Sequence, residues 1–336
     1  MEKIKVIFTG GTIGSLVSGN DINTNSETQY LLLNKYGKNL ERFTTSNPLF
    51  ILSENANLGN VILMAKEIKK SQEENIKGII LTHGTDTLSY TAAYLSFILQ
   101  DLKVPVVLVS SDYVLTDERA NGNINFAAAV SLIDSGVEPN VYVAYKNFDE
   151  DYANIHLAVR MKETPTNSSC YYSAHNYLFA KFINGKIVFE NTKVEKSNKK
   201  FEFDLNVGKR GLFIHPYLGL DYNVYKNIDC DFVLHNLYHS GTANTQNYEG
   251  ETDTNFLNFA DFCKNKQIPL YLCNIKKQDI NYSSTNLFLQ KDIKPIYNTL
   301  TNIALAKLYC AYNFIEEKDR EEFLNTSICG EVIDFI

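Results

Sequence analysis

Two threonine-rich turns carry the side chains in this sequence that are best suited to chemistry. The first is Thr9–Gly14, with the sequence TGGTIG, and the second is Leu81–Thr87, with the sequence LTHGTDT. Adjacent glycines allow a tight turn and let the backbone approach a ligand closely. Thr12 presents a hydroxyl at the first turn, and a hydroxyl becomes a nucleophile when a neighbouring base activates it. The second turn offers the Thr85 hydroxyl and the Asp86 carboxylate.

Each turn also has a plainer interpretation. The first is equally consistent with a simple turn between a strand and a helix, and threonine or aspartate in the second could cap a helix. The first turn lacks the glycine spacing of a dinucleotide site and the lysine of a phosphate loop. His83 lacks the neighbours of a catalytic triad or a metal site and is interpreted as structural. Capping does not explain why two such turns follow two separate strands.

The elements that must position these turns alternate between short apolar runs and helix-period segments. The runs predict strands at Ile4–Phe8, Phe50–Ser53, Gly78–Leu81, Val104–Val109 and Val141–Tyr145, and the periodic segments predict helices over 58–65, 88–99 and 124–133. Such alternation predicts an α/β fold with a doubly wound, mainly parallel sheet and helices on both faces. In an open sheet of this kind ligands bind at the carboxyl ends of the strands, where both turns fall.

A second, smaller α/β domain is predicted in the C-terminal part. Residues 190–210 are polar and lysine-rich and are interpreted as a linker between an N-terminal catalytic domain, 1–189, and a C-terminal domain, 211–336. Within the latter, apolar runs predict strands at Gly211–His215, Phe232–Leu237 and Pro269–Cys273, with helices over 256–263 and 301–312.

Composition narrows the class of protein. The chain has 336 residues, and its net charge of -7 argues against a nucleic-acid surface, which needs clustered lysine and arginine. No apolar leader or membrane-spanning stretch is evident, so a cytoplasmic protein that does not bind membranes is expected. The six cysteines are scattered without paired spacing, as is typical of reduced thiols in the cytosol.

Together, TGGTIG and the later THGTDT resemble the L-asparaginase family, in particular its bacterial cytoplasmic type I members. The resemblance implies an amidohydrolase of asparagine catabolism that converts L-asparagine to L-aspartate and ammonia without metal or organic cofactor. It implies Thr12 as the nucleophile, with Thr85 and Asp86 completed by a lysine from a later strand. Lys162 is the candidate, although Arg160 precedes it by two residues where the family has a spacing of three. An exposed lysine at a strand end is the alternative.

The family also implies residues that bind the substrate and close over it. Ser53 and Glu54 would hold the α-carboxylate and α-amino groups of the amino acid, and Asp86 would pair with its α-ammonium. The polar segment Leu16–Gln29 would form a mobile lid with Tyr30 as its tyrosine. A plain polar loop at Ser53, and a surface loop with Tyr30 in the core, are the alternatives.

Two further segments bear on the resemblance. The stretch Ser110–Val114 lacks the arginine and proline that the family has after its fourth strand, which affects the expected substrate preference more than the fold. The turn Leu237–Ala243 matches the place where family members contribute residues across a subunit interface, so a homodimer or homotetramer is expected. A plain surface turn is the alternative.

Two other functions stay open, and a third is disfavoured. A glutaminase-asparaginase is one, because a single methylene changes discrimination by only about 1–3 kcal/mol. The asparaginase-like subunit of an amidotransferase acting on misacylated transfer RNA is another. It is disfavoured because that subunit type carries an additional N-terminal domain, whereas the first motif here begins at residue 9. The second open function is a non-catalytic amino-acid-binding protein on the same fold.

Overall fold

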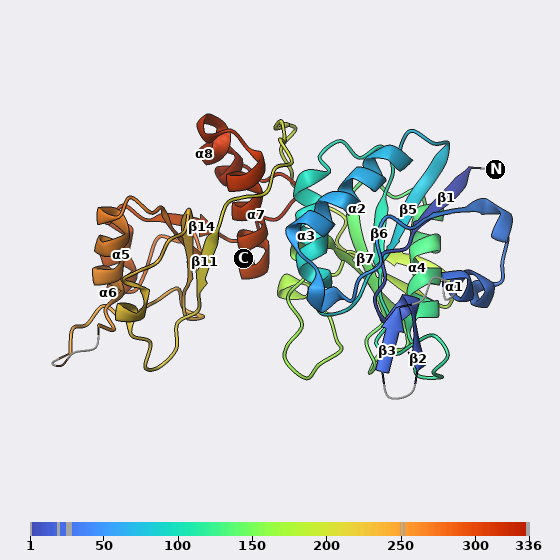
Figure 1. The fold of residues 1–336 in the computed structure, drawn as a ribbon, viewed down its shortest axis with the longest axis horizontal. Coiled ribbons are helices and arrows are strands. Elements are labelled where there is room, and N and C mark those ends of the chain that lie inside the picture. The colour runs from blue at the N-terminus through green and yellow to red at the C-terminus, as the bar shows by residue number, and fades with distance from the viewer. Residues whose placement is uncertain (1, 19–20, 25–28, 249, 251–252, 334–336) are drawn as a thin grey trace. The chain divides into compact units, whose positions relative to one another are not determined.

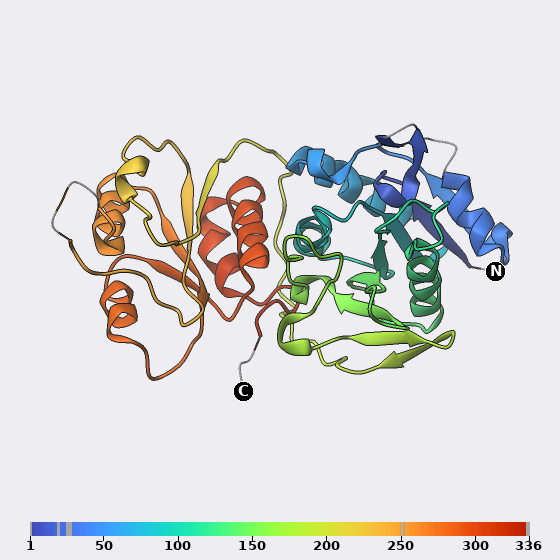
Figure 2. The same cartoon turned by 90° about the horizontal axis from the view of Figure 1, so that it is seen from below.

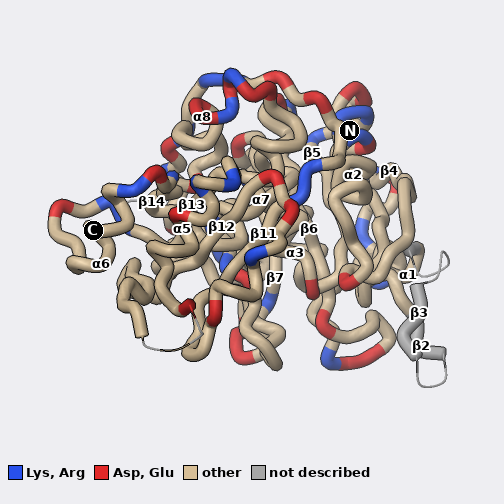
Figure 3. The backbone as a smooth tube through the Cα atoms, turned by 60° about the vertical axis from the view of Figure 1, so that its left-hand side comes forward, with Lys and Arg blue, Asp and Glu red and all other residues tan. Residues whose placement is uncertain are grey.

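The computed structural model describes residues 2–18, 21–24, 29–248, 250 and 253–333. The chain divides into two compact units, Met1–Lys196 and Ser197–Ile336. Within the described residues, no helix is long and apolar enough to cross a membrane. Lysine and arginine are interspersed with aspartate and glutamate along the backbone of each unit (Figure 3).

Eight strands form the sheet of the first unit, in the order β10-β9-β8-β7-β6-β5-β1-β4. The five that pair in parallel are β1 (Lys3–Ile7), β4 (Phe43–Ser46), β5 (Ile76–Thr82), β6 (Val106–Val109) and β7 (Val141–Tyr145). The three that continue the sheet antiparallel are β8 (Ala153–Leu157), β9 (Ala180–Ile183) and β10 (Lys186–Phe189). A separate hairpin pairs β2 (Ser15–Ser18) with β3 (Asp21–Thr24).

Helices cover both faces of this sheet. α2 (Leu58–Ser71) and α3 (Leu88–Ile98) lie on one face, whereas α1 (Gln29–Tyr36) and α4 (Gly122–Asp134) lie on the other (Figures 1 and 2). All residues of β6 and β7 are buried, because helices cover both faces of the sheet there. Since β5, β6 and β7 are successive neighbours and their connecting helices lie on opposite faces, one of the two crossovers is left-handed, which is rare in parallel sheets.

The second unit has a parallel four-stranded sheet in the order β11-β12-β13-β14. Its strands are β11 (Gly211–Ile214), β12 (Phe232–Asn236), β13 (Leu270–Ile275) and β14 (Lys294–Tyr297), and its helices are α5 (Phe256–Asn265), α6 (Ser283–Leu289), α7 (Thr301–Phe314) and α8 (Glu317–Asn325). A buried ion pair of 2.8 Å joins Lys307 on α7 to Glu331. The predicted α/β class, with a larger mainly parallel sheet and a smaller second one, is confirmed.

One predicted strand is wrong. Phe50–Ser53 forms no strand: Ile51 makes a single parallel bridge to Gly10, and a 3-10 turn begins at Ser53. The strand beside β1 is instead β4, Phe43–Ser46, whose sequence FTTS is half-buried and lacks an apolar run. Pro48 follows it and has no N–H to donate to a ladder, so the pairing is interrupted between β4 and the single bridge at Ile51.

Stability in acid should depend on a buried histidine of the first unit. His156 lies on β8, fully buried, and burial lowers its pKa to about 3 from an ordinary value of 6.5. The unfolded imidazole takes up a proton below pH 6.5 while the folded one stays neutral to about pH 3, so acid favours unfolding. Each pH unit below 6.5 should remove about 1.4 kcal/mol from the free energy of unfolding through this residue.

Urea unfolding of the wild type and of His156→Gln, measured from about pH 7 to about pH 5, tests this expectation. The variant lacks the titrating group, so the difference between the two free energies should narrow with that slope below pH 6.5. A difference that stays constant over the whole range would contradict the assignment.

Candidate active site

The first threonine-rich turn follows β1 at the carboxyl end of the parallel sheet. Gly10 and Gly11 have φ of 104° and 76°, in the left-handed region that favours glycine. The Gly11 N–H donates to the carbonyl of Ile51 at 3.0 Å, which fixes this turn against the segment that leads to Ser53. Thr12 begins a short 3-10 turn, Thr12–Gly14, and is half-buried.

The second turn lies beside the first because β5 pairs in parallel with β1. The register aligns Ile7 with Leu81, so both strands end at the same level. Beyond them, the Thr9 hydroxyl donates to the Thr82 carbonyl at 2.5 Å, and the Thr9 N–H donates to the Thr82 hydroxyl at 3.2 Å. These two threonines tie the turns together, a role that the motifs alone do not indicate.

Where the turns touch, the backbones of Gly11 and Gly84 lie against each other, and the Ser53 side chain packs on Gly84. A Cβ atom on Gly11 would lie 2.3 Å from the backbone nitrogen of Gly84, and one on Gly84 would lie 2.4 Å from Oγ of Ser53. Real Cβ atoms do not come so close to other heavy atoms, so this packing requires glycine at both positions. The two turns and the Ser53 turn therefore form one rigid cluster at the sheet edge.

Ser53 and Asp86 are brought together by this cluster. Ser53 is buried, and its hydroxyl donates to Oδ2 of Asp86 at 3.1 Å while accepting the Asp86 N–H at 3.2 Å. The Thr87 hydroxyl donates to the Ser53 carbonyl at 2.9 Å. Asp86 itself is exposed, as is the neighbouring Glu54, so carboxylates face solvent beside a buried hydroxyl. Such an arrangement can bind an ammonium group.

Lys162 belongs to the same unit as this cluster, but within the described part of the chain its side chain makes no hydrogen bond to Thr85 or Asp86. β8 ends at Leu157, and Lys162 follows a 3-10 turn, so its predicted position on a strand is wrong. Its side chain is exposed, and its N–H donates to the Tyr172 carbonyl at 2.9 Å. The next residue, Glu163, accepts a hydrogen bond from Tyr90 of α3 at 2.9 Å, which keeps the segment beside the start of that helix.

The predicted lid falls partly outside the described residues, namely at 19–20 and 25–28. Its described parts form the β2–β3 hairpin instead of an irregular loop. Tyr30 lies in the first turn of α1 and is 62% exposed, so the alternative that places it in the core is wrong. Its role as a lid tyrosine stays a prediction.

The segment that departs from the family motif is a self-bonded turn after β6. The Ser111 hydroxyl donates to the Tyr113 carbonyl at 2.6 Å and accepts the Gly122 N–H at 3.1 Å. Asp112 is half-buried, and burial raises the pKa of its carboxyl above the ordinary value. The Asn121 side chain accepts the Asp112 N–H at 3.0 Å, so this asparagine helps to shape the turn.

His83 lies in the second motif but faces the interior. Its ring is buried, and Nδ1 lies 2.8 Å from the Gly84 carbonyl oxygen. Burial lowers its pKa, which keeps the imidazole neutral at neutral pH. Within the described residues no group of three histidine, cysteine, aspartate or glutamate side chains could hold a metal ion.

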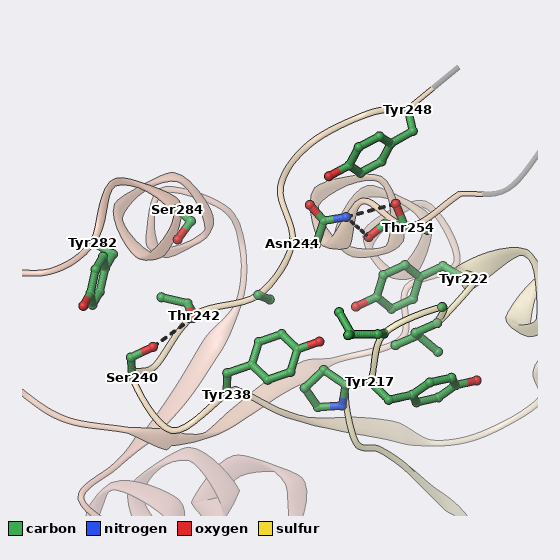
Figure 4. A pocket seen from close by; sticks show the side chains of 15 residues that line it. Tyr217, Tyr222, Tyr238, Ser240, Thr242, Asn244, Tyr248, Thr254, Tyr282 and Ser284 are labelled. Atoms are coloured by element: carbon green, nitrogen blue, oxygen red, sulfur yellow. Dashed lines mark hydrogen bonds between the residues drawn. The ribbon is translucent and has the colours of Figure 1, made fainter. Parts of the chain in front are cut away.

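The turn Leu237–Ala243 lies in the second unit, at the carboxyl end of β12. A hydrogen bond of 3.0 Å from the Tyr238 N–H to the Thr242 carbonyl closes the turn. The turn lines a cavity of about 680 Å³ (Figure 4). The lining is rich in tyrosine and hydroxyl side chains and has no charged residue among those described. Within the turn, the hydroxyl groups of Ser240 and Thr242 are hydrogen-bonded at 3.1 Å (Figure 4). A contribution of this turn to a neighbouring subunit stays a prediction.

Comparisons with known proteins agree with this architecture. Residues 3–195 match the family model described as "Asparaginase, N-terminal". A glutamyl-tRNA(Gln) amidotransferase subunit of Saccharolobus solfataricus is 26% identical over 352 residues, which cover 98% of this chain and 76% of that protein. Similar solved structures include the thermostable L-asparaginase of Thermococcus kodakarensis, with a TM-score of 0.79, 22% identity and coverage of 99% of this chain and 100% of that chain. L-asparaginase I of Vibrio cholerae has a TM-score of 0.77, 21% identity and 99% coverage of both chains.

A methyl group at Gly84 should disrupt the contact among the three turns. Gly84→Ala would force its Cβ against Ser53, so overpacking should lower the free energy of unfolding by about 1–3 kcal/mol. Gly208→Ala is the matched control, because no atom lies within 4 Å of a Cβ there and its φ lies outside the left-handed range. Urea unfolding of both variants checks this, and equal effects of the two substitutions would contradict the proposed close packing.

Proposed function

The chain belongs to the asparaginase family, whose fold supports amidohydrolase activity, and from that premise we propose that it hydrolyses L-asparagine to L-aspartate and ammonia. The observation that carries the proposal is the contact of Ser53 with Asp86 beside the adjoining turns of Thr12 and Thr85. In the proposed site the adjoining turns supply the nucleophile and a proton-transfer group, and Asp86 supplies the carboxylate that binds ammonium.

In the proposed reaction the Thr12 hydroxyl attacks the side-chain amide carbon of asparagine. Its proton passes toward the set formed by Thr85, Lys162 and Asp86, and backbone N–H groups of the glycine turns stabilise the oxyanion. The C–N bond then breaks, and the nitrogen leaves as ammonia after taking a proton. Water hydrolyses the resulting ester to release aspartate and restore the Thr12 hydroxyl.

Substrate binding would use the exposed carboxylates around the buried serine. One carboxylate oxygen of Asp86 accepts the hydrogen bond of the Ser53 hydroxyl, and the carboxylate keeps further acceptor positions for the α-ammonium of the substrate. Ser53 and Glu54 complete the recognition of the α-carboxylate and α-amino groups. Lys162 is exposed in this structure, so its participation requires its side chain to turn toward Thr85.

We further propose that the chain acts as a homodimer or homotetramer in the cytoplasm, with closed symmetry. The uncharged, tyrosine-rich cavity beside Leu237–Ala243 supports a role for the second unit in contact with another subunit. Neither a metal ion nor an organic cofactor is required by the proposed reaction.

A second candidate follows from the curated relative that bears the name of an amidotransferase subunit. On this proposal the same residues would release ammonia from an amino-acid amide for transfer to another acceptor. The shared chemistry of attack on an amide is unchanged, and the two candidates differ in the preferred amide and in the need for a partner protein.

Loss of either threonine hydroxyl should abolish turnover. Thr12→Ala and Thr85→Ala should each lower kcat for L-asparagine at least about 10³-fold, because a nucleophile and its proton-transfer partner act as a unit. Thr12→Ser keeps a hydroxyl and should retain part of the activity, and Thr326→Ala serves as a control on the exposed end of α8. Ammonia release measures the effect, and full activity in both alanine variants would refute the site.

The choice of amide should separate the two candidates. An asparaginase should show kcat/KM for L-asparagine about 10–200 times that for L-glutamine, the range that one methylene provides. Ammonia release is measured with each amide and the purified chain alone. A preference for glutamine would favour the amidotransferase candidate, and no release from either amide would refute hydrolysis.

A further inference from the structure

The peptide group between Thr85 and Asp86 is held at both of its edges. We propose that Tyr171 is a positioning residue for the reaction and fixes this peptide through its hydrogen bond to the Thr85 carbonyl. The inference rests on the proposed function, because Thr85 and Asp86 are the residues whose side chains it orients. It adds a residue from a segment that carries no motif.

The geometry of the two bonds gives the peptide one orientation. The Tyr171 hydroxyl donates to the Thr85 carbonyl oxygen, and the N–H of Asp86 donates to the Ser53 hydroxyl at 3.2 Å. Because the peptide unit is planar, a rotation of this plane would break both bonds at once. Another donor to the same carbonyl, the N–H of Leu88, lies 3.4 Å away and is therefore weak. Tyr171 thus supplies the main restraint on the carbonyl side.

Tyr171 is itself held rigidly. The Asn147 side chain accepts the Tyr171 N–H at 2.9 Å and donates to its carbonyl at 3.1 Å, and Asn147 is fully buried. The Tyr171 ring packs edge-on against Tyr145, with 4.7 Å between ring centroids, and is 2% exposed. Burial raises the pKa of Tyr171, so its hydroxyl stays protonated and able to donate at neutral pH. A donor held in this way needs no rearrangement before it acts.

The segment after Tyr171 also carries the backbone of Lys162. The Tyr172 carbonyl accepts the Lys162 N–H at 2.9 Å, and Met161 pairs antiparallel with Ser173. One short segment therefore bonds to Thr85 through a side chain and to Lys162 through its backbone. Loss of the Tyr171 hydroxyl would loosen Thr85 relative to Lys162 while Ser53 still holds Asp86.

Tyr171→Phe tests the inference, with Tyr142→Phe as its matched control. Tyr142 is equally buried in the same unit, and its hydroxyl also donates to a backbone carbonyl, that of Glu138, at 3.0 Å before β7 begins. The melting temperature should fall by similar amounts in the two variants. Tyr171→Phe alone should lower kcat for the preferred amide by about 10- to 100-fold, as a small misplacement of a reacting group does. KM should change by less than about threefold, because Asp86 keeps its bond to Ser53.

Two results separate the failure of this inference from failure of the proposed function. If the wild type releases ammonia and both variants have the same kcat, Tyr171 does not position the site. If the wild type releases no ammonia, hydrogen exchange of a peptide covering residues 82–90 decides whether Tyr171 restrains the peptide group between Thr85 and Asp86. Faster exchange in Tyr171→Phe than in Tyr142→Phe supports the restraint on this peptide, and equal exchange overturns it.

Discussion

The close packing of the Gly11 and Gly84 backbones with the Ser53 side chain is the constraint on which the rest of the site depends. Adjacent parallel strands bring their ends together, but they leave the turns free to splay apart. Here two glycines remove the side chains that would separate the turns, and a third segment fits against them with its serine oxygen. At either glycine a single added methyl group would not fit, because protein interiors are closely packed. The geometry at the sheet edge therefore depends on the absence of these two side chains.

From this contact the polar groups acquire fixed places. The Ser53 hydroxyl is buried and binds both the backbone and the carboxylate of Asp86, so the exposed carboxylate has a defined orientation. The Thr85–Asp86 peptide is then restrained from its other edge by Tyr171, which Asn147 anchors in the core. Lys162 is exposed at the surface of this frame, and the proposed reaction requires its side chain to turn toward Thr85.

Most strands of the sheet and both threonine-rich turns could be predicted from the sequence. The features that could not be predicted were missed for physical reasons. The buried runs of β1, β5, β6 and β7 are largely apolar, so their periodicity identifies them. β4 lies at the sheet edge with the polar sequence FTTS, and the apolar residues after it are bound by only one bridge. The turns of Thr12 and Thr85 are identifiable by their residue types. Tyr171 is not, because it lies 86 residues from Thr85 and the residues around it in the sequence carry no motif that signals its bond.

The proposed covalent role of Thr12 is tested most directly by mass spectrometry of the protein quenched in acid during turnover of L-asparagine. Thr12 attack predicts a β-aspartyl ester that maps to the peptide containing residues 9–14, is absent when asparagine is omitted, and is lost in Thr12→Ala. An ester on the peptide that contains Thr85, with none on Thr12, would contradict the account and move the nucleophile to the second turn.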